Sequence, residues 1–136
     1  MRVFLDTNVI VGSVAARGLC ADVMREVLVN HKLIISETLL DEVESVLRSK
    51  IGVPPGLISE LLHLLRESSL LSESASIPDL PNCEHNDKAL VSAALNAKAD
   101  VLVTGDKALL DVKGRDRMEI VSPRMFWEKV KGPSGE

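Results

Sequence analysis

Short apolar runs alternate along the chain with longer segments in which apolar residues recur every three or four positions. Strands buried on both faces read as such short runs, and the sequence predicts them at residues 2–6, 32–36, 101–104 and 119–121. Apolar residues at helical spacing predict helices over residues 19–30, 36–48, 57–71, 86–98 and 122–130. Alternating strands and helices predict an α/β domain with a mostly parallel sheet.

Polar and turn-forming residues set the expected boundaries. Ser36 and Ser122 stand where helix N-caps belong, and Pro123 suits a first helical position. The remaining expectations are a turn at 6–8, a helix stop at 52–56, a polar loop at 72–84 holding a short strand at 75–77, and a helical turn at 108–110. Because we find no repeat or linker, we expect one domain over residues 1–131 and a flexible tail at 132–136.

Composition narrows the classes of function. The chain of 136 residues has two Phe, one Trp and no Tyr, so stacking of bases on aromatic side chains is not its main device. Its net charge is −4, which argues against whole-surface attraction of nucleic acid. A nucleic-acid contact therefore needs a local basic patch.

The cysteines and the apolar runs indicate in which cellular compartment we expect the protein. Cys20 and Cys83 have no zinc-ligand spacing and suit free thiols in a reducing cytoplasm. No apolar stretch approaches the roughly 18 residues of a membrane helix, and the first run is broken by Asp6 and Asn8, unlike a signal peptide. We expect a cytoplasmic protein without a membrane partner.

One acidic residue lies on an apolar helix face. On the helix expected at 86–98, Asp87 shares the face of Leu90, Val91 and Ala94. A buried carboxylate needs a partner or a cation. The simpler interpretation is a helix-capping role near the N-terminus. Other acids of the chain also lie beside apolar runs. This favours a cation site that several carboxylates share over a capping role alone.

Two more acids follow predicted strands. Asp6 and Asp106 each come directly after a buried run, where sites form in parallel sheets. Each alone is equally well a turn residue. On the helix at 36–48, Glu42 and Glu44 border the apolar face on opposite sides, and periodicity does not choose between them. Both also suit solvated border positions.

Two neutral polar residues suit a supporting role. Asn8 can hydrogen-bond Asp6 or a phosphate, and Thr104 can orient Asp106 or a bound water. Ordinary turn and strand-end hydrogen bonds are the alternative. The lone histidines His31, His63 and His85 are weaker candidates as ligands.

Together these motifs resemble the PIN domain family. They are Asp6-Thr-Asn8, Glu42 in a Ser-x-x-x-x-x-Glu-Val helix, Asp87-Lys-Ala-Leu and Thr104-Gly-Asp106. Their order and spacing are most similar to the prokaryotic VapC-like ribonucleases, the toxin components of toxin–antitoxin pairs. The resemblance implies a three-layer fold, with a central twisted sheet of four to five mostly parallel strands between helices.

The resemblance also implies a nuclease site of clustered acids. By position, the family acids fall on Asp6, Glu42, Asp87 and Asp106, which selects Glu42 over Glu44. Relatives often carry a run of acids just before the third one, and here Asn86 replaces an acid. We expect this replacement to weaken metal affinity.

Four carboxylates without cysteine or histidine favour Mg²⁺ or Mn²⁺ over zinc. Asp6, Asp87 and Asp106 are the expected ligands, with Glu42 at a second ion or positioning water. A bound ion would polarise a phosphate oxygen and activate water. The sequence leaves open whether one or two ions bind.

The resemblance implies an RNA substrate. Basic residues that follow the first and fourth acids are candidates for contact with its phosphates, with a solvated surface as the equal alternative; they are Arg17, Lys107, Lys113, Arg115 and Arg117.

Other functions stay open at this stage. A degenerate domain that binds RNA or protein would have the same fold without nuclease activity. A housekeeping RNA-processing nuclease would have both the fold and the activity. An aspartyl-phosphate phosphotransferase would use Asp6 as nucleophile, but such enzymes usually carry a second acid where Asn8 stands. A small antitoxin or a second copy of the chain could cover the apolar segment 57–71.

Overall fold

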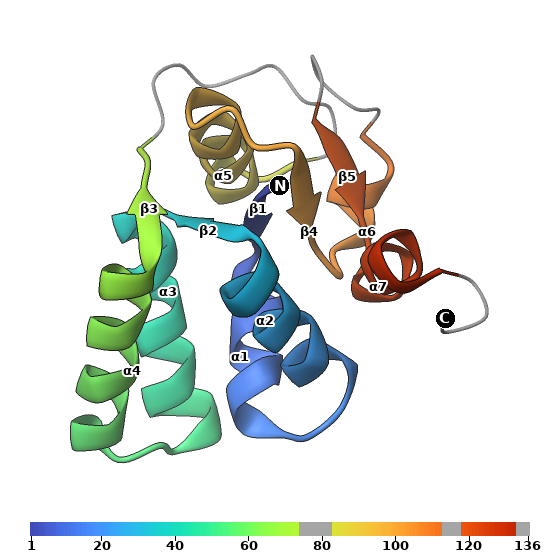
Figure 1. The fold of residues 1–136 in the computed structure, drawn as a ribbon. Coiled ribbons are helices and arrows are strands. Elements are labelled where there is room, and N and C mark those ends of the chain that lie inside the picture. Colours follow the sequence, from blue (N-terminus) through green and yellow to red (C-terminus); the bar gives the residue numbers. More distant parts are fainter. Residues whose placement is uncertain (74–82, 113–117, 133–136) are drawn as a thin grey trace.

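A five-stranded parallel sheet forms the centre of the molecule (Figure 1). The structure is a computed structural model that describes residues 1–73, 83–112 and 118–132. The strand order is β3-β2-β1-β4-β5. The strands are β1 (Arg2–Leu5), β2 (Lys32–Ile35), β3 (Ser69–Leu71), β4 (Val101–Val103) and β5 (Glu119–Val121).

Helices cover both faces of the sheet, which confirms the predicted fold class. One side carries α1 (Thr7–Ala15), α2 (Leu19–Asn30), α3 (Glu37–Val46) with its π-helical extension η1 (Leu47–Ile51), and α4 (Pro55–Ser68). The other side carries α5 (His85–Asn96) (Figure 1). The short α6 (Lys107–Leu110) joins β4 to β5, and α7 (Pro123–Lys131) packs against α2.

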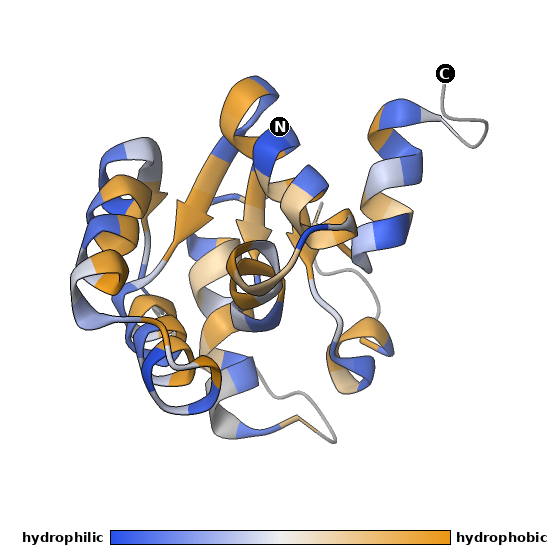
Figure 2. Ribbon diagram, turned by 90° about the horizontal axis from the view of Figure 1, so that it is seen from below, coloured by the Kyte–Doolittle hydropathy of each residue, from blue (hydrophilic) through white to orange (hydrophobic). Residues whose placement is uncertain are grey.

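The core lies between the sheet and its helices. Apart from their first residues, β1 and β2 are buried throughout, and so is the whole of β4. Phe4 and Phe126 are the largest fully buried side chains of the described residues. Figure 2 shows the strands as mainly hydrophobic and the outer helix surfaces as largely hydrophilic. Within the three described ranges, no helix is long and apolar enough to cross a membrane.

Two sequence-based expectations were wrong. Residues after Asp6 form the helix α1 and not only a turn, although the segment is rich in β-branched residues; its burial against the core overrides this weak local preference. The helix expected at 57–71 ends at Ser68, because Ser69–Leu71 pair with β2 as an edge strand. The strand expected at 75–77 lies outside the described residues.

The point where the strand order reverses lies between β1 and β4. From β1 the chain moves outward through β2 to β3, and then returns to the other side of β1 to form β4. Ligands of open α/β sheets bind outside the carboxyl ends of strands at such a point. Asp6 and Thr104 are the first residues after these two strands.

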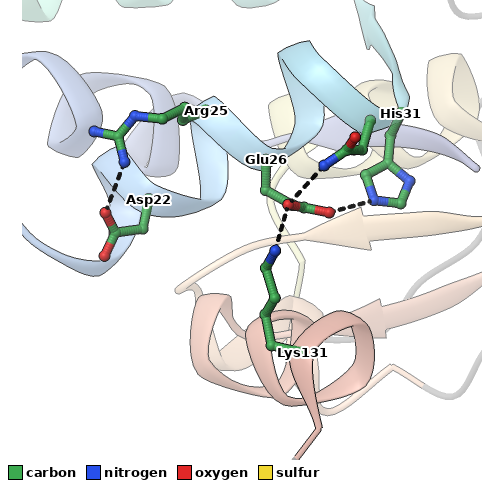
Figure 3. Close-up of polar contacts among 6 residues, drawn as sticks. Asp22, Arg25, Glu26, His31 and Lys131 are labelled. Atoms are coloured by element: carbon green, nitrogen blue, oxygen red, sulfur yellow. Dashed lines mark hydrogen bonds and ion pairs between the residues drawn. The ribbon is translucent and has the colours of Figure 1, made fainter. Parts of the chain in front are cut away.

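A polar cluster at the opposite end of the strands joins α7 to α2 (Figure 3). Glu26 accepts hydrogen bonds from Asn30 at 3.0 Å and His31 at 3.1 Å, and it forms an ion pair with Lys131 at 3.0 Å. We call these four side chains the Glu26 cluster.

Candidate carboxylate site

Asp6 stands between the end of β1 and the start of α1, and it is 6% exposed. Its Oδ1 accepts a hydrogen bond from the Thr7 backbone N–H at 2.7 Å. Its Oδ2 accepts one from the Thr104 hydroxyl at 2.6 Å. Burial raises the pKa of Asp6, the two hydrogen bonds oppose this rise, and the Asp106 charge adds to it.

Thr104 links Asp6 to Asp106. It is fully buried at the end of β4. While its hydroxyl donates to Asp6, the same oxygen accepts the Asp106 backbone N–H at 3.0 Å. Asp106 in turn caps α6, with its Oδ1 accepting the Ala108 N–H at 2.9 Å. Both carboxylates are thereby held at one edge of the sheet.

Asp87 joins this pair from the first turn of α5. Because α5 leads into β4, its N-terminus lies near the carboxyl edge of the parallel strands. The pKa of Asp87 is raised to about 6, first by burial and then by the charge of Asp106, by a hydrogen bond with Asp106 and by the charge of Asp6. Burial, this hydrogen bond and the two nearby charges therefore all favour the protonated form of Asp87.

Backbone N–H groups at helix starts stabilise these acids. Asp87 accepts from the N–H of Glu84, the N-cap residue of α5, while Asp6 caps α1. The positive end of a helix dipole favours negative charge at such positions. The capping interpretation of Asp87 is therefore compatible with a place in the carboxylate cluster.

Glu42 connects to the cluster through Thr7. Its Oε2 accepts the Thr7 hydroxyl at 3.1 Å, and its side chain is partly buried on α3. Glu44 forms an ion pair with Arg48 at 3.5 Å on the outer side of the same helix. The structure therefore brings Glu42, and not Glu44, toward the other acids.

Glu42 also lines a surface hollow between α3 and α5. Its other lining residues include Ser36, Leu90 and Ala93, and its volume of about 10 Å³ is close to the room that one water molecule needs.

The donor chemistry of the cluster suits a hard divalent cation. The groups that meet are carboxylate and hydroxyl oxygens, the ligand type of Mg²⁺ and Mn²⁺. Within the described ranges, however, no three Asp, Glu, His or Cys side chains are close enough to hold a metal ion. The structure thus places Asp6, Asp87 and Asp106 within electrostatic range of one another.

The structure places the other candidate residues less centrally. Asn8 is exposed on α1, and the hydrogen bonds to Asp6 come from Thr7 and Thr104. Arg17 follows the nine residues of α1, which carry it about 14 Å along the helix axis from Asp6. Lys107 is exposed beside Asp106. Lys113, Arg115 and Arg117 lie outside the described residues, as do the side chains of His85 and Asn86.

Two further residues near the acids are not among the candidates expected from the sequence. One is Thr7, which bonds to both Asp6 and Glu42. The other is Lys88, which is half-buried next to Asp87. Burial and the charges of Asp87 and Asp106 raise the pKa of the nearby Cys83 thiol, and Lys88 opposes this. Adjacency to an acid was the only available signal for either residue.

Comparison with known proteins agrees with the observed fold. The model of the PIN domain family matches residues 2–108. Among solved structures, VapBC2 from Rickettsia felis bound to a DNA fragment from their promoter superposes with a TM-score of 0.58. That chain is 16% identical, and the match covers 90% of this chain and 98% of the other. This likeness shows the fold. A search of curated proteins finds no match.

Proposed function

Because this chain belongs to the PIN domain family, we propose that it is a metal-dependent ribonuclease that hydrolyses phosphodiester bonds. One observation carries the proposal: Asp6, Asp87 and Asp106 lie within electrostatic range of one another at the switch point of the sheet, and the pKa values of Asp6 and Asp87 are raised. Nucleases of this family generally use divalent metal ions. Groups with perturbed pKa values that cluster at such a position are characteristic of functional sites.

Asp6, Asp87 and Asp106 would hold the ion or ions, Mg²⁺ or Mn²⁺, with Glu42 at their border. When bound, such an ion supplies polarisation of a phosphate oxygen and activation of water as the nucleophile. Asp87, whose pKa is raised to about 6, must lose its proton before it can act as a ligand. Thr104 and the N–H of Thr7 keep Asp6 fixed through this change.

RNA is the substrate we infer from the family. The acidic cluster repels a phosphate chain, so neighbouring cations must compensate. Lys88 and Lys107 come directly after two of the acids and are suited to bind phosphates on either side of the bond that is cut. Lys113, Arg115 and Arg17 are further candidates for a longer stretch of RNA.

The physiological role can be that of a toxin with a small antitoxin partner, as in the VapBC2 complex, or that of an RNA-processing nuclease. A second function, a binding module without catalysis, is favoured by one observation. In the described ranges, three acidic groups do not come close enough to hold a metal ion. An assay of cleavage together with metal binding separates these candidates.

The test is cleavage of labelled single-stranded RNA in Mg²⁺ or Mn²⁺, with EDTA as the metal-free control. We expect cutting by the wild type and loss of at least about 100-fold in Asp87→Asn, since a metal ligand is removed. Glu42→Gln should lower the rate, whereas Glu44→Gln on the same helix should not.

Equal activity in wild type and Asp87→Asn would indicate a contaminating nuclease. If the folded wild type neither cuts RNA nor binds either metal in calorimetry, the binding module is the correct interpretation.

A further inference from the structure

Glu42 is held differently from the other acids of the site. Asp6, Asp87 and Asp106 each accept a backbone N–H at a helix start, which fixes their orientation. Among the hydrogen bonds of residues 1–73, 83–112 and 118–132, Glu42 accepts only the Thr7 hydroxyl. A glutamate side chain also has more rotamers to lose than an aspartate.

Thr7 is placed to control this carboxylate. It is 6% exposed and forms the first residue of α1. Its backbone N–H donates to Asp6 at 2.7 Å, and its hydroxyl donates to Glu42 at 3.1 Å. One residue thus connects Asp6, which lies between β1 and α1, to Glu42 on α3. The helices α1 and α3 pack directly against each other, which keeps this bridge short.

We propose that Thr7 is a positioning residue whose hydroxyl orients Glu42 toward Asp6 and so completes the carboxylate site for a divalent cation. This inference rests on the proposed metal-dependent function. Thr7 itself binds neither metal nor substrate; it acts through Glu42. Hydrogen bonds to metal-binding carboxylates commonly matter in this way for affinity.

The test compares two substitutions that leave the backbone hydrogen bond to Asp6 in place. Thr7→Val keeps the β-branched shape and removes the hydroxyl, whereas Thr7→Ser keeps the hydroxyl. Mn²⁺ binding, measured by calorimetry and by electron paramagnetic resonance of free Mn²⁺, is the readout. We expect Thr7→Val to weaken Mn²⁺ binding about 10-fold and Thr7→Ser to bind as the wild type does.

A double-mutant cycle with Glu42→Gln distinguishes positioning from a general structural role. If Thr7 acts through Glu42, then Thr7→Val will have no further effect on Mn²⁺ affinity in the Glu42→Gln background. An equal effect in both backgrounds, or wild-type affinity in Thr7→Val, would overturn the inference. Thermal unfolding of each variant shows whether it is folded at the temperature used.

Cleavage assays on the same proteins keep the two proposals separate. A wild type that cuts RNA without coupling between Thr7 and Glu42 would refute the positioning role alone. Coupling in Mn²⁺ binding without RNA cleavage would support Thr7 and refute the ribonuclease. A wild type that does not bind Mn²⁺ would refute both.

Discussion

Asp87 is the residue at which folding and function oppose each other most directly. Its pKa is raised to about 6 because burial and the neighbouring Asp106 disfavour the ionised form. An isolated aspartate has a pKa near 3.9, so the folded chain binds a proton more tightly than the unfolded chain. Around pH 7 the metal-free fold therefore loses stability by holding this carboxylate ionised.

The first prediction follows for Asp87→Asn. Between pH 4 and 6 the wild type loses stability from this group as pH rises, because the folded-state pKa is the higher one. At pH 7.5 without metal, the variant should be more stable by about 1 kcal/mol, a value reduced for partial solvent screening. Urea unfolding at pH 4 and pH 7.5 measures this. A destabilised variant at pH 7.5 would contradict it.

At the level of secondary-structure elements, the acids of the site lie at helix starts and strand ends. Asp6 connects β1 to α1, Asp106 connects β4 to α6, and Asp87 opens α5. At each of these helix starts, a backbone N–H group donates a hydrogen bond to the acidic side chain. At the other end of the sheet, α2 and α7 are joined by the Glu26 cluster (Figure 3).

The second prediction concerns this junction. Burial disfavours ionised Glu26, but hydrogen bonds from Lys131, Asn30 and His31 outweigh it, so its pKa is lowered. The stabilisation is therefore present above the unfolded-state pKa and is lost as pH falls through the folded-state value. Glu26→Gln should cost about 1–2 kcal/mol at neutral pH and less in acid, as measured by urea unfolding.

Asp22→Asn is the matched control for that measurement. Asp22 lies one turn earlier on α2 and pairs with Arg25 at 3.2 Å, but both side chains are exposed. Its loss should change stability by less than about 0.5 kcal/mol. If Glu26→Gln and Asp22→Asn change the free energy of unfolding equally, the Glu26 cluster does not stabilise the packing of α7 against α2.

The molecule as a whole is acidic and is proposed to act on an anion. Its net charge is −4, and three carboxyl groups lie within electrostatic range of one another at the proposed site. A divalent cation would relieve their repulsion and attract phosphate at the same place. Stability, metal binding and substrate binding should therefore change together with pH.

The third prediction tests this coupling. A ligand that binds only the folded state raises stability according to its concentration relative to the Kd. Mn²⁺ at about 100 times the Kd should add about 2.7 kcal/mol at pH 7.5. At pH 5.5 the gain should be smaller, because Asp87, with a pKa of about 6, is then mostly protonated. Thermal unfolding with and without Mn²⁺ measures both.

An Asp87→Asn/Asp106→Asn double variant is the control for metal binding elsewhere on the surface. It should unfold at the same temperature with and without Mn²⁺ at either pH. A Mn²⁺-dependent rise of wild-type size in this variant would place the metal at another site.

The sequence by itself determined the α/β class, most helix and strand positions and the family. It could do so because periodicity, caps and strand-end acids are local signals within a few residues. Ser36 and Ser122 cap helices as expected, accepting the N–H groups of Leu39 and Met125. Candidate acids were likewise visible as carboxylates on apolar flanks.

Only the tertiary structure decided how those residues meet. The bonds Thr7–Glu42 and Thr104–Asp6 join residues 35 and 98 positions apart, and no local pattern encodes such pairs. The same holds for the helix α1 and the edge strand β3, which depend on packing and on pairing with β2. The raised pKa of Asp87 also needs the three-dimensional proximity of Asp106, because charge interactions depend on distance in space and not along the chain.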